Sequence, residues 1–210
     1  MDSVVYSEIK KTHYPEIKKI LCKAFDFDEN DVSPFCLRAH LSFYLHSYLR
    51  FATFRLAAEV DGRVAGFLFA CAGRSVFSFC HWQDHFLFWF NALLLLFSKE
   101  GRRRLRFEKA INVCNTYLLR NKKDQFDSEL LLFGVRDNMQ GKGIGFGMSQ
   151  RLFSWLKEHG KRRIFLFTDD VCNVEYYRAN GYKLENQREL FICEPPEFRS
   201  IFYLYSKDIT

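Results

Sequence analysis

Glycine occupies every second position from 141 to 147 in the segment VRDNMQGKGIGFGMSQRL. The segment follows the apolar run ELLLFGV, which is typical of a strand buried on both faces, and it continues into a pattern typical of a helix. Glycines at a helix N-terminus leave free N–H groups and remove the Cβ atoms that would keep an anion away from the backbone. The segment therefore indicates an anion site, although tight packing of the helix on the strand would also favour glycine.

The glycine segment lacks the features of two familiar nucleotide sites. A P-loop ends in Gly-Lys-Ser/Thr, whereas Lys142 is followed by Gly143, which offers no hydroxyl to Mg²⁺. The dinucleotide fingerprint G-x-G-x-x-G is broken by the alternating glycines, and it requires an acidic residue about 20 positions further on. Asp169 and Asp170 come later than that. The pattern therefore disfavours both a nucleoside triphosphate with Mg²⁺ and a dinucleotide.

A second segment adds to the meaning of the first. Residues 170–184 read DVCNVEYYRANGYKL and combine an asparagine, a pair of tyrosines and a Gly-Tyr step. Together with Gln140-Gly141-Lys142-Gly143-Ile144-Gly145, this segment resembles the two signatures of the GNAT N-acetyltransferase superfamily. Those signatures are the Gln/Arg-x-x-Gly-x-Gly/Ala loop that binds acyl-CoA and a later Asn, Phe/Tyr-Tyr and Gly-Phe/Tyr. Both occur here in the family's order, and the resemblance covers residues 128–184.

The resemblance implies a binding site for acetyl-CoA. Backbone amides of the glycine loop would bind the pyrophosphate, and the edge of the preceding strand would pair with the pantetheine amides. Asn173 would hydrogen-bond the pantetheine arm, and Gly134 fits a place where another chain approaches closely. The expected cofactor-binding residues are Phe133, Gly134, Val135, Gln140, Gly141, Lys142, Gly143, Ile144, Gly145 and Asn173.

The reaction implied by the resemblance is the attack of a neutral amine on a thioester carbonyl, which needs a base for the ammonium proton and an acid for the departing thiolate. Tyr177 stands where the family places its acid, although a buried structural tyrosine would fit the same position. Glu129 lies eleven residues before Gln140, where some relatives carry a catalytic glutamate. Other relatives use a water or a different carboxylate, and a strand-end glutamate in solvent would also explain Glu129.

Apolar periodicity locates the elements that must position these residues. Strands are expected at 4–8, 54–60, 63–70, 129–135, 163–167, 182–190 and 200–205, and helices at 14–25, from 31 to about 51, from the glycine segment through 157, and at 173–179. The expected fold class is α/β (α+β): a GNAT-like mixed, mostly antiparallel central sheet flanked by helices, with a helical insertion between the third and fourth strands. Residues 1–210 are expected to form a single domain.

The insertion, at about 75–122, departs from the family, which usually passes almost directly from the hairpin to the next strand. Its segment FLFWFNALLLLF, residues 86–97, would span about 18 Å as a helix, short of the ~30 Å hydrocarbon core of a bilayer. We therefore expect no stable membrane insertion. The helix is expected to be buried in the domain or in a homodimer interface, and the insertion to cover the acceptor site or to mediate dimerisation. Attachment to lipid headgroups through Phe86 to Arg104 is the alternative.

Composition limits the class of protein further. Of 210 residues, 48% are hydrophobic and 27% charged, the balance of a globular protein with a real core. The net charge of +6 suits an anionic ligand, but without a stacking motif no nucleic acid partner is expected. Seven scattered cysteines without a CxxC pattern indicate reduced thiols and a cytoplasmic location. His81 and His85 approach a zinc motif, but Asp84 replaces its glutamate and no third ligand is apparent, so no metal is expected.

These observations predict a cytoplasmic N-acetyltransferase, a transferase of the acyltransferase class. It would move an acetyl group from acetyl-CoA to a primary amine by direct attack in a ternary complex, without a metal. The sequence leaves the acceptor open between a small-molecule amine and a peptide. The alternative is a non-catalytic sensor or interaction module that binds acyl-CoA on the same fold.

Overall fold

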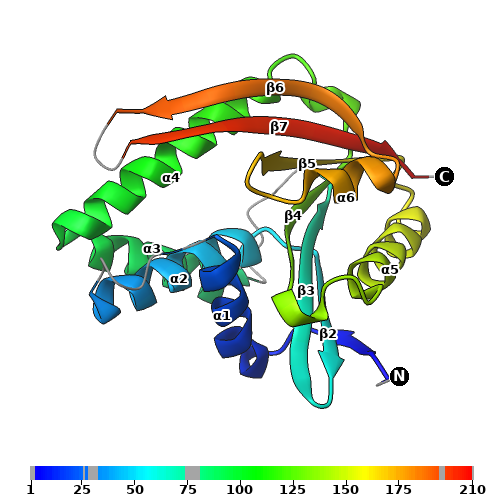
Figure 1. The fold of residues 1–210 in the computed structure, drawn as a ribbon, viewed down its shortest axis with the longest axis horizontal. Coiled ribbons are helices and arrows are strands. Elements are labelled where there is room, and N and C mark those ends of the chain that lie inside the picture. The colour runs from blue at the N-terminus through cyan, green and yellow to red at the C-terminus, as the bar shows by residue number, and fades with distance from the viewer. Residues whose placement is uncertain (1–2, 26, 28–32, 74–80, 194–196, 210) are drawn as a thin grey trace.

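A computed structural model describes residues 3–25, 27, 33–73, 81–193 and 197–209. Seven strands form one mixed sheet, and helices flank both of its faces (Figure 1), which confirms the expected fold class. The strands are β1 (Val5–Glu8), β2 (Phe54–Val60), β3 (Arg63–Ala72), β4 (Ser128–Val135), β5 (Arg163–Asp169), β6 (Lys183–Ile192) and β7 (Phe198–Asp208). The helices are α1 (Tyr14–Ala24), α2 (Pro34–Leu49), α3 (Trp82–Leu96), α4 (Lys99–Leu118), α5 (Ile144–Glu158) and α6 (Val174–Ala179). The expected helix start at residues 31 and 32, the first part of the insertion (75–80) and Cys80 lie outside the described residues.

The sheet consists of two antiparallel halves that meet at a short parallel contact. Its strand order is β1-β2-β3-β4-β5-β7-β6, and only β4 and β5 are parallel neighbours. These two strands pair at Ser128↔Ile164 and Glu129↔Phe165 and then diverge. β4 stays paired with β3 as far as Val135. Among the described residues, the edge of β4 that faces β5 therefore has no strand partner from Leu130 onward, and the sheet opens there (Figure 1).

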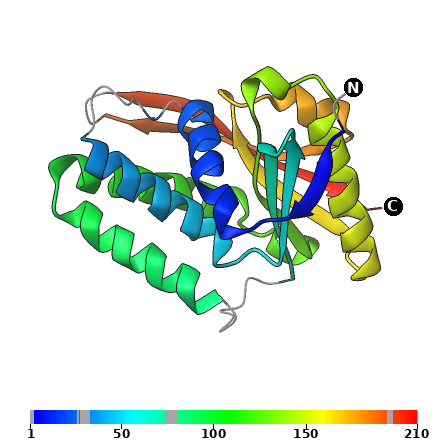
Figure 2. The ribbon, with the colours of Figure 1, turned by 90° about the horizontal axis from the view of Figure 1, so that it is seen from below.

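Separate hydrophobic clusters cover the two faces of the sheet. On one face, α1 and α2 bury residues such as Ile17 and Leu45 against Phe67 of β3. On the other face, α5 buries Met148 and Leu152 against strands of both halves. Figure 2 shows α5 on the side of the sheet opposite α1 and α2. This arrangement fixes α5, and with it the glycine loop, against the point where the two halves join.

The insertion between β3 and β4 consists of α3 and α4. Helix α3 packs along α2, and α4 extends from α3 to β6 and β7 (Figure 1). The C-terminal end of α4 contributes Cys114 and Leu118 to a cluster with Phe165 and Leu204 from the strands of the second half. The insertion therefore connects the α2 layer to the β6–β7 hairpin across one face of the molecule.

The expectation that residues 86–97 form a helix buried within the domain is wrong for one side of the helix. The inward side of α3 is covered by α2, but its outer side is exposed over several large apolar residues. The physical reason is that the segment is apolar around its whole circumference whereas a neighbouring helix covers only one face. Within the described ranges, no helix is both long enough and apolar enough to cross a membrane. A homodimer interface on this helix stays a prediction.

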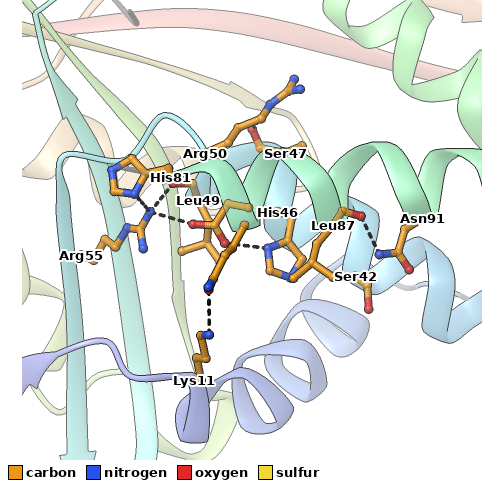
Figure 3. Close-up of polar contacts among 12 residues, drawn as sticks. Lys11, Ser42, His46, Ser47, Leu49, Arg50, Arg55, His81, Leu87 and Asn91 are labelled. Carbon is orange, nitrogen blue, oxygen red and sulfur yellow. Dashed lines mark hydrogen bonds and ion pairs between the residues drawn. The ribbon is translucent and has the colours of Figure 1, made fainter. Parts of the chain in front are cut away.

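A buried polar cluster holds α3 in this orientation (Figure 3). The Asp84 carboxylate lies 2.8 Å from Nδ1 of His46 on α2 and accepts a hydrogen bond of 3.0 Å from Arg55 on β2. Arg55 also contacts Nδ1 of His81 at 3.0 Å and the carbonyl of Leu49. Burial by itself would raise the pKa of Asp84, but the hydrogen bond from His46 and the charge of Arg55 lower the pKa below its usual value. The cluster therefore fixes α3 to α2 and to the sheet.

Replacing Asp84 by asparagine should destabilise the folded protein by about 3 kcal/mol at neutral pH, because it leaves a buried cation without its counter-charge. Because the pKa of Asp84 is lowered in the folded state, the stability that the carboxylate provides is present above its unfolded pKa and is lost as the pH falls through the folded pKa. The difference between the variant and the wild type should therefore shrink in acid. Urea unfolding over a range of pH measures this. The control is Glu189→Gln, which breaks the exposed Glu189–Arg199 pair and should have little effect; equal losses in both variants would contradict the role of Asp84.

Candidate functional site

The N-terminus of α5 presents unpaired backbone amides. Gly141 and Gly143 have φ of 74° and 77°, the left-handed region that glycine adopts without strain, and added Cβ atoms would meet nothing within 4 Å. The first intrahelical bond runs from the Gly147 N–H to the Gly143 carbonyl. Among the described residues, the N–H groups of Ile144 and Phe146 have no backbone acceptor. These amides and the positive end of the helix dipole form a site for an anion.

The polar side chains of the loop stabilise the loop itself. Gln140 donates a hydrogen bond of 3.3 Å from Nε2 to the carbonyl of Val135, the last residue of β4. Lys142 is exposed, with Nζ 3.4 Å from the sulfur of Met139. Gln140 therefore ties the loop to the end of the strand through its side chain, whereas its predicted ligand contact was through the backbone.

The other two glycines of the alternating series have a packing role. A Cβ at Gly145 would lie 3.0 Å from the Phe133 ring and 3.5 Å from the Tyr176 hydroxyl. A Cβ at Gly147 would lie 2.1 Å from the Tyr6 hydroxyl, well inside contact distance. The two explanations of the sequence pattern therefore both apply, to different glycines: exposed backbone at 141 and 143, and tight packing of the helix at 145 and 147.

Strand β4 presents Phe133, Gly134 and Val135 beside the opening of the sheet. The close neighbour at Gly134 is the Phe67 ring, 2.9 Å from the position of an added Cβ, with Ile20 of α1 at 3.5 Å. Glycine is therefore required at 134 by packing under α1, a different reason from the expected approach of another chain. Within the part of the chain that the structure describes, the backbone edge that faces β5 has no strand partner at these three positions.

A β-bulge in β4 was not expected from the sequence. Phe69 of β3 pairs with Leu132, and the next residue, Ala70, pairs with Leu130, so Leu131 is an extra residue without a Cα partner on β3. Bulges change the direction of neighbouring groups and are frequent beside active sites. The sequence carries no signal for this bulge, because three consecutive leucines look the same in either register.

Glu129 lies at the point where the two halves of the sheet separate. It pairs with Cys71 of β3 on one side and with Phe165 of β5 on the other. Burial raises the pKa of Glu129 to about 7, against a smaller lowering effect of Lys123. Burial and then the charge of Glu129 raise the pKa of the Cys71 thiol to about 11. Glu129 is therefore partly buried and readily protonated, unlike a strand-end glutamate in solvent.

Tyr177 lies on α6 among other aromatic rings. Its ring is 5.5 Å from that of Tyr182 and 6.2 Å from that of Tyr205, measured between centroids. Burial, followed by the nearby Cys172 thiol, raises the pKa of Tyr177 far above its ordinary value, so the phenol keeps its proton. Asn173 caps α6 by accepting a hydrogen bond of 3.1 Å from the Tyr176 N–H. The cap engages the side-chain oxygen of Asn173, the residue that is expected to hydrogen-bond the pantetheine arm.

The sequence did not indicate a third group of residues, on α2 and α4, that lies within electrostatic reach of Glu129. The hydroxyls of Tyr44 and Tyr48 are 3.3 Å apart on α2. Burial raises the pKa of Tyr48, and the charges of Glu108, Glu129 and Cys172 act in the same direction. Cys172 also raises the pKa of Tyr177. Tyr48 of α2 is therefore near enough to Glu108 of α4, Glu129 of β4 and Cys172 for each of them to influence its protonation.

The near-zinc sequence at His81 and His85 forms a different arrangement. Asp84 is engaged by His46 and Arg55 in the cluster that holds α3. In the described part of the chain, no group of three or more His, Cys, Asp or Glu side chains is placed to hold a metal ion.

Comparison with known proteins gives one family match and many structural matches. The model of the acetyltransferase (GNAT) family matches residues 14–182. An N-acetyltransferase from Staphylococcus aureus Mu50 is 13% identical, with 99% of each chain covered and a TM-score of 0.57. The ribosomal-protein-S18-alanine N-acetyltransferase from Escherichia coli is 12% identical over 99% of this chain and 95% of that one, with a TM-score of 0.55.

A third similar structure is a putative acetyltransferase from Salmonella typhimurium with its cofactor acetyl-CoA. It is 12% identical, covers 100% of this chain and 95% of that one, and has a TM-score of 0.55. At these identities the structures show likeness of fold. No curated protein sequence matches the chain.

Replacing Glu129 by glutamine should stabilise the folded protein at high pH. The Glu129 pKa is about 7 in the folded chain and about 4.3 in a model peptide. Because the folded-state pKa is raised, ionisation costs stability progressively as the pH rises between these two values. In acid the variant should gain almost no stability, and above the folded-state pKa it should gain up to about 4 kcal/mol. Urea unfolding at several pH values measures it, with exposed Glu158→Gln as the control; no gain at high pH would show that the Glu129 pKa is not raised.

Proposed function

This chain belongs to the acetyltransferase (GNAT) family and is an acyltransferase, and on that premise we propose that it transfers an acetyl group from acetyl-CoA to a primary amine by direct attack in a ternary complex. The observation that carries the proposal is the position of Glu129. A carboxyl group with a pKa of about 7 lies where β4 and β5 separate, on the strand whose far end leads into the glycine loop. The acceptor is a small-molecule amine or a peptide.

The donor would bind along the opening between β4 and β5. Its pyrophosphate would accept hydrogen bonds from the free amides between Gln140 and Gly145 and from Phe146. The pantetheine amides would pair with the unpartnered edge of β4 at Phe133 to Val135, in the manner of an added strand. The similar Salmonella protein, described with its cofactor acetyl-CoA, supports this choice of donor.

The chemical step requires three proton transfers. Glu129 removes a proton from the ammonium group, and the neutral nitrogen then forms a bond to the thioester carbonyl carbon. The C–S bond breaks, and the Tyr177 hydroxyl gives its proton to the departing sulfur. The nitrogen loses its second proton, which restores the tyrosine, so the products are the acetylated amine, CoA thiol and one proton. An N–H at the Leu131 bulge would polarise the carbonyl oxygen.

The acceptor would lie on the face covered by α2 and α4. Glu129 and Glu108 supply negative charge there, and the rings of Tyr44 and Tyr48 supply aromatic surface beside it. Carboxylates and aromatic faces both favour a cationic group. In this proposal the insertion covers the acceptor site through α4. The six described cysteines are free thiols, which supports a cytoplasmic location.

Replacing Phe146, which is exposed in the first turn of α5, by glutamate should weaken CoA binding about tenfold relative to Phe146→Gln. The new carboxylate would repel the pyrophosphate but would interact favourably with the helix dipole, so the thermal stability should not fall. Calorimetric titration at low and high salt measures the difference, which salt should reduce. S-acetyl-pantetheine lacks the diphosphate, so both variants should use it equally well as an acetyl donor. Equal CoA affinity for the two variants would place the pyrophosphate elsewhere.

The dependence of kcat/KM on pH should show an acidic limb with an apparent pKa of about 7, because only ionised Glu129 can accept the proton. Glu129→Gln should remove this limb and lower kcat/KM by about 10²–10⁴-fold, with CoA affinity unchanged. Tyr177→Phe should lower kcat and keep the limb. Thiol release with a panel of amines measures both. Unchanged thiol release in either variant would remove that residue from the mechanism.

A further inference from the structure

Helix α3 does not have the polar outer side of an ordinary surface helix. Its inward side mixes the apolar Phe88 and Leu95 with polar residues, including Asp84 in the cluster described above and Asn91, whose amide donates to the Leu87 carbonyl at 2.7 Å. Its outward side is apolar, although a surface helix normally directs polar residues to water. The outward residues, exposed by 47% to 78%, are Trp82, Phe86, Trp89, Phe90, Leu93, Leu96 and Phe97. We call these seven residues the aromatic face.

The aromatic face is too large to be an incidental feature of a surface. Single exposed apolar residues are common, but these recur at helical spacing along the whole of α3. The five aromatic side chains alone expose on the order of 600 Å², at about 200 Å² for each fully exposed ring. That area reaches the upper limit for the largest apolar patch of a typical monomer. The face is therefore expected to have a partner.

Positive charge follows directly on the aromatic face. Residues 99–109, which begin immediately after the face, contain six basic and two acidic residues. Lys99, Arg102 and Arg103 are exposed, and Arg102 donates to the Leu96 carbonyl at the end of α3. Glu108 is turned inward beside His40, and Asp84, the one acidic residue between 82 and 97, is buried. Glu100 is the exposed acidic residue of residues 99–109, against five exposed basic residues, so the exposed charge beside the aromatic face is mainly positive.

This combination fits a lipid surface better than a second copy of the chain. A symmetric dimer through α3 would place two copies of the same basic segment beside one dry interface, where they repel. An anionic bilayer instead neutralises the arginines and lysines while the rings enter the boundary between headgroups and acyl chains. Tryptophan in particular favours that boundary, because its ring is apolar and its N–H is polar. Helix α3 is about 22 Å long, which suits a position in the plane of the surface.

We propose that the aromatic face of α3, with the basic start of α4, docks the protein on the surface of an anionic phospholipid bilayer. Helix α3 lies parallel to the surface, its rings among the headgroups and Lys99, Arg102 and Arg103 on the phosphates. The glycine loop and α5 lie on the other side of the sheet (Figure 2). Docking therefore leaves the anion site at α5 in water, and it does not depend on the proposed acetyl transfer.

The experiment uses the positions of the three tryptophans. Trp82 and Trp89 belong to the aromatic face, whereas Trp155 of α5 packs on His159, the residue just past the end of that helix, with 4.1 Å between ring centroids. Trp155→Phe should keep a blue shift of emission when phosphatidylcholine vesicles containing phosphatidylserine are added. The variant with Trp82→Phe and Trp89→Phe retains apolar rings, so it should bind equally but show no shift. A shift from Trp155 alone would overturn the proposed orientation.

Vesicle co-sedimentation then tests the two components of the surface. Phe86→Gln with Trp89→Gln should reduce partitioning by more than about tenfold. Lys99→Gln with Arg102→Gln should reduce partitioning to anionic vesicles about fivefold for each cation removed. It should not change partitioning to uncharged vesicles. The control is Leu184→Gln with Phe191→Gln, a pair of apolar residues on β6 that are also exposed, by 45% and 53%, and that should change nothing. Circular dichroism and urea unfolding establish that each variant is folded.

Two results would overturn the proposal. One is the absence of partitioning of the wild type to anionic vesicles at low salt. The other is a dimer that forms without lipid, as measured by sedimentation velocity, and that Phe86→Gln with Trp89→Gln dissociates. The second result would assign the aromatic face to a second copy of this chain. CoA affinity, measured in parallel, should be the same in all of these variants, which separates this test from the test of the proposed function.

Discussion

Strand β4 is hydrogen-bonded to β3 along its length but to β5 at only two positions, and the arrangement of the site depends on this difference. A backbone N–H or C=O group inside a protein needs a partner, so an opening in the middle of a sheet is stable only if something else can fill it. The opening here is bounded by α5 on one side and by α2 and α4 on the other (Figure 1). A molecule that offers amides to the strand and phosphate to the helix N-terminus can satisfy both boundaries at once.

The chemistry of the opening follows from burial. Glu129 stands at its narrow end, where water is scarce enough to bring the pKa of a carboxyl group to about 7. The same lack of water keeps Tyr177 protonated. Glu129 can thus accept a proton and Tyr177 can donate one under the same conditions. Burial is the main cause of both pKa shifts. Holding a readily protonated carboxyl group in this place costs folding stability, which is a common property of sites that perform chemistry.

The insertion shows how one helical pair can serve two sides of a protein. Inward, α4 brings Glu108 to His40 and near the tyrosines of α2, and its C-terminal end packs on β5 and β7. Outward, α3 keeps large apolar side chains in water because the polar cluster around Asp84 fixes the rotation of the helix. Rotating α3 to bury its rings would expose or break that cluster. The exposed aromatic surface is therefore a stable feature of the fold, because the interactions of the Asp84 cluster offset the cost of keeping these rings in water.

The sequence by itself determined the order of strands and helices, because alternation and helical periodicity are local patterns. It also located the glycine loop and the tyrosine segment, because both consist of residues that are close in the chain. Only the tertiary structure decided which glycines are exposed and which are packed, that β4 contains a bulge at Leu131, and that Tyr48 lies within the influence of Glu129. The tertiary structure also decided that the aromatic rings of α3 point outward. From Phe86 to Leu96 the helix is apolar on all sides except at Asn91, so periodicity could not say which side would be covered. The partner that covers one side, α2, is distant in the chain.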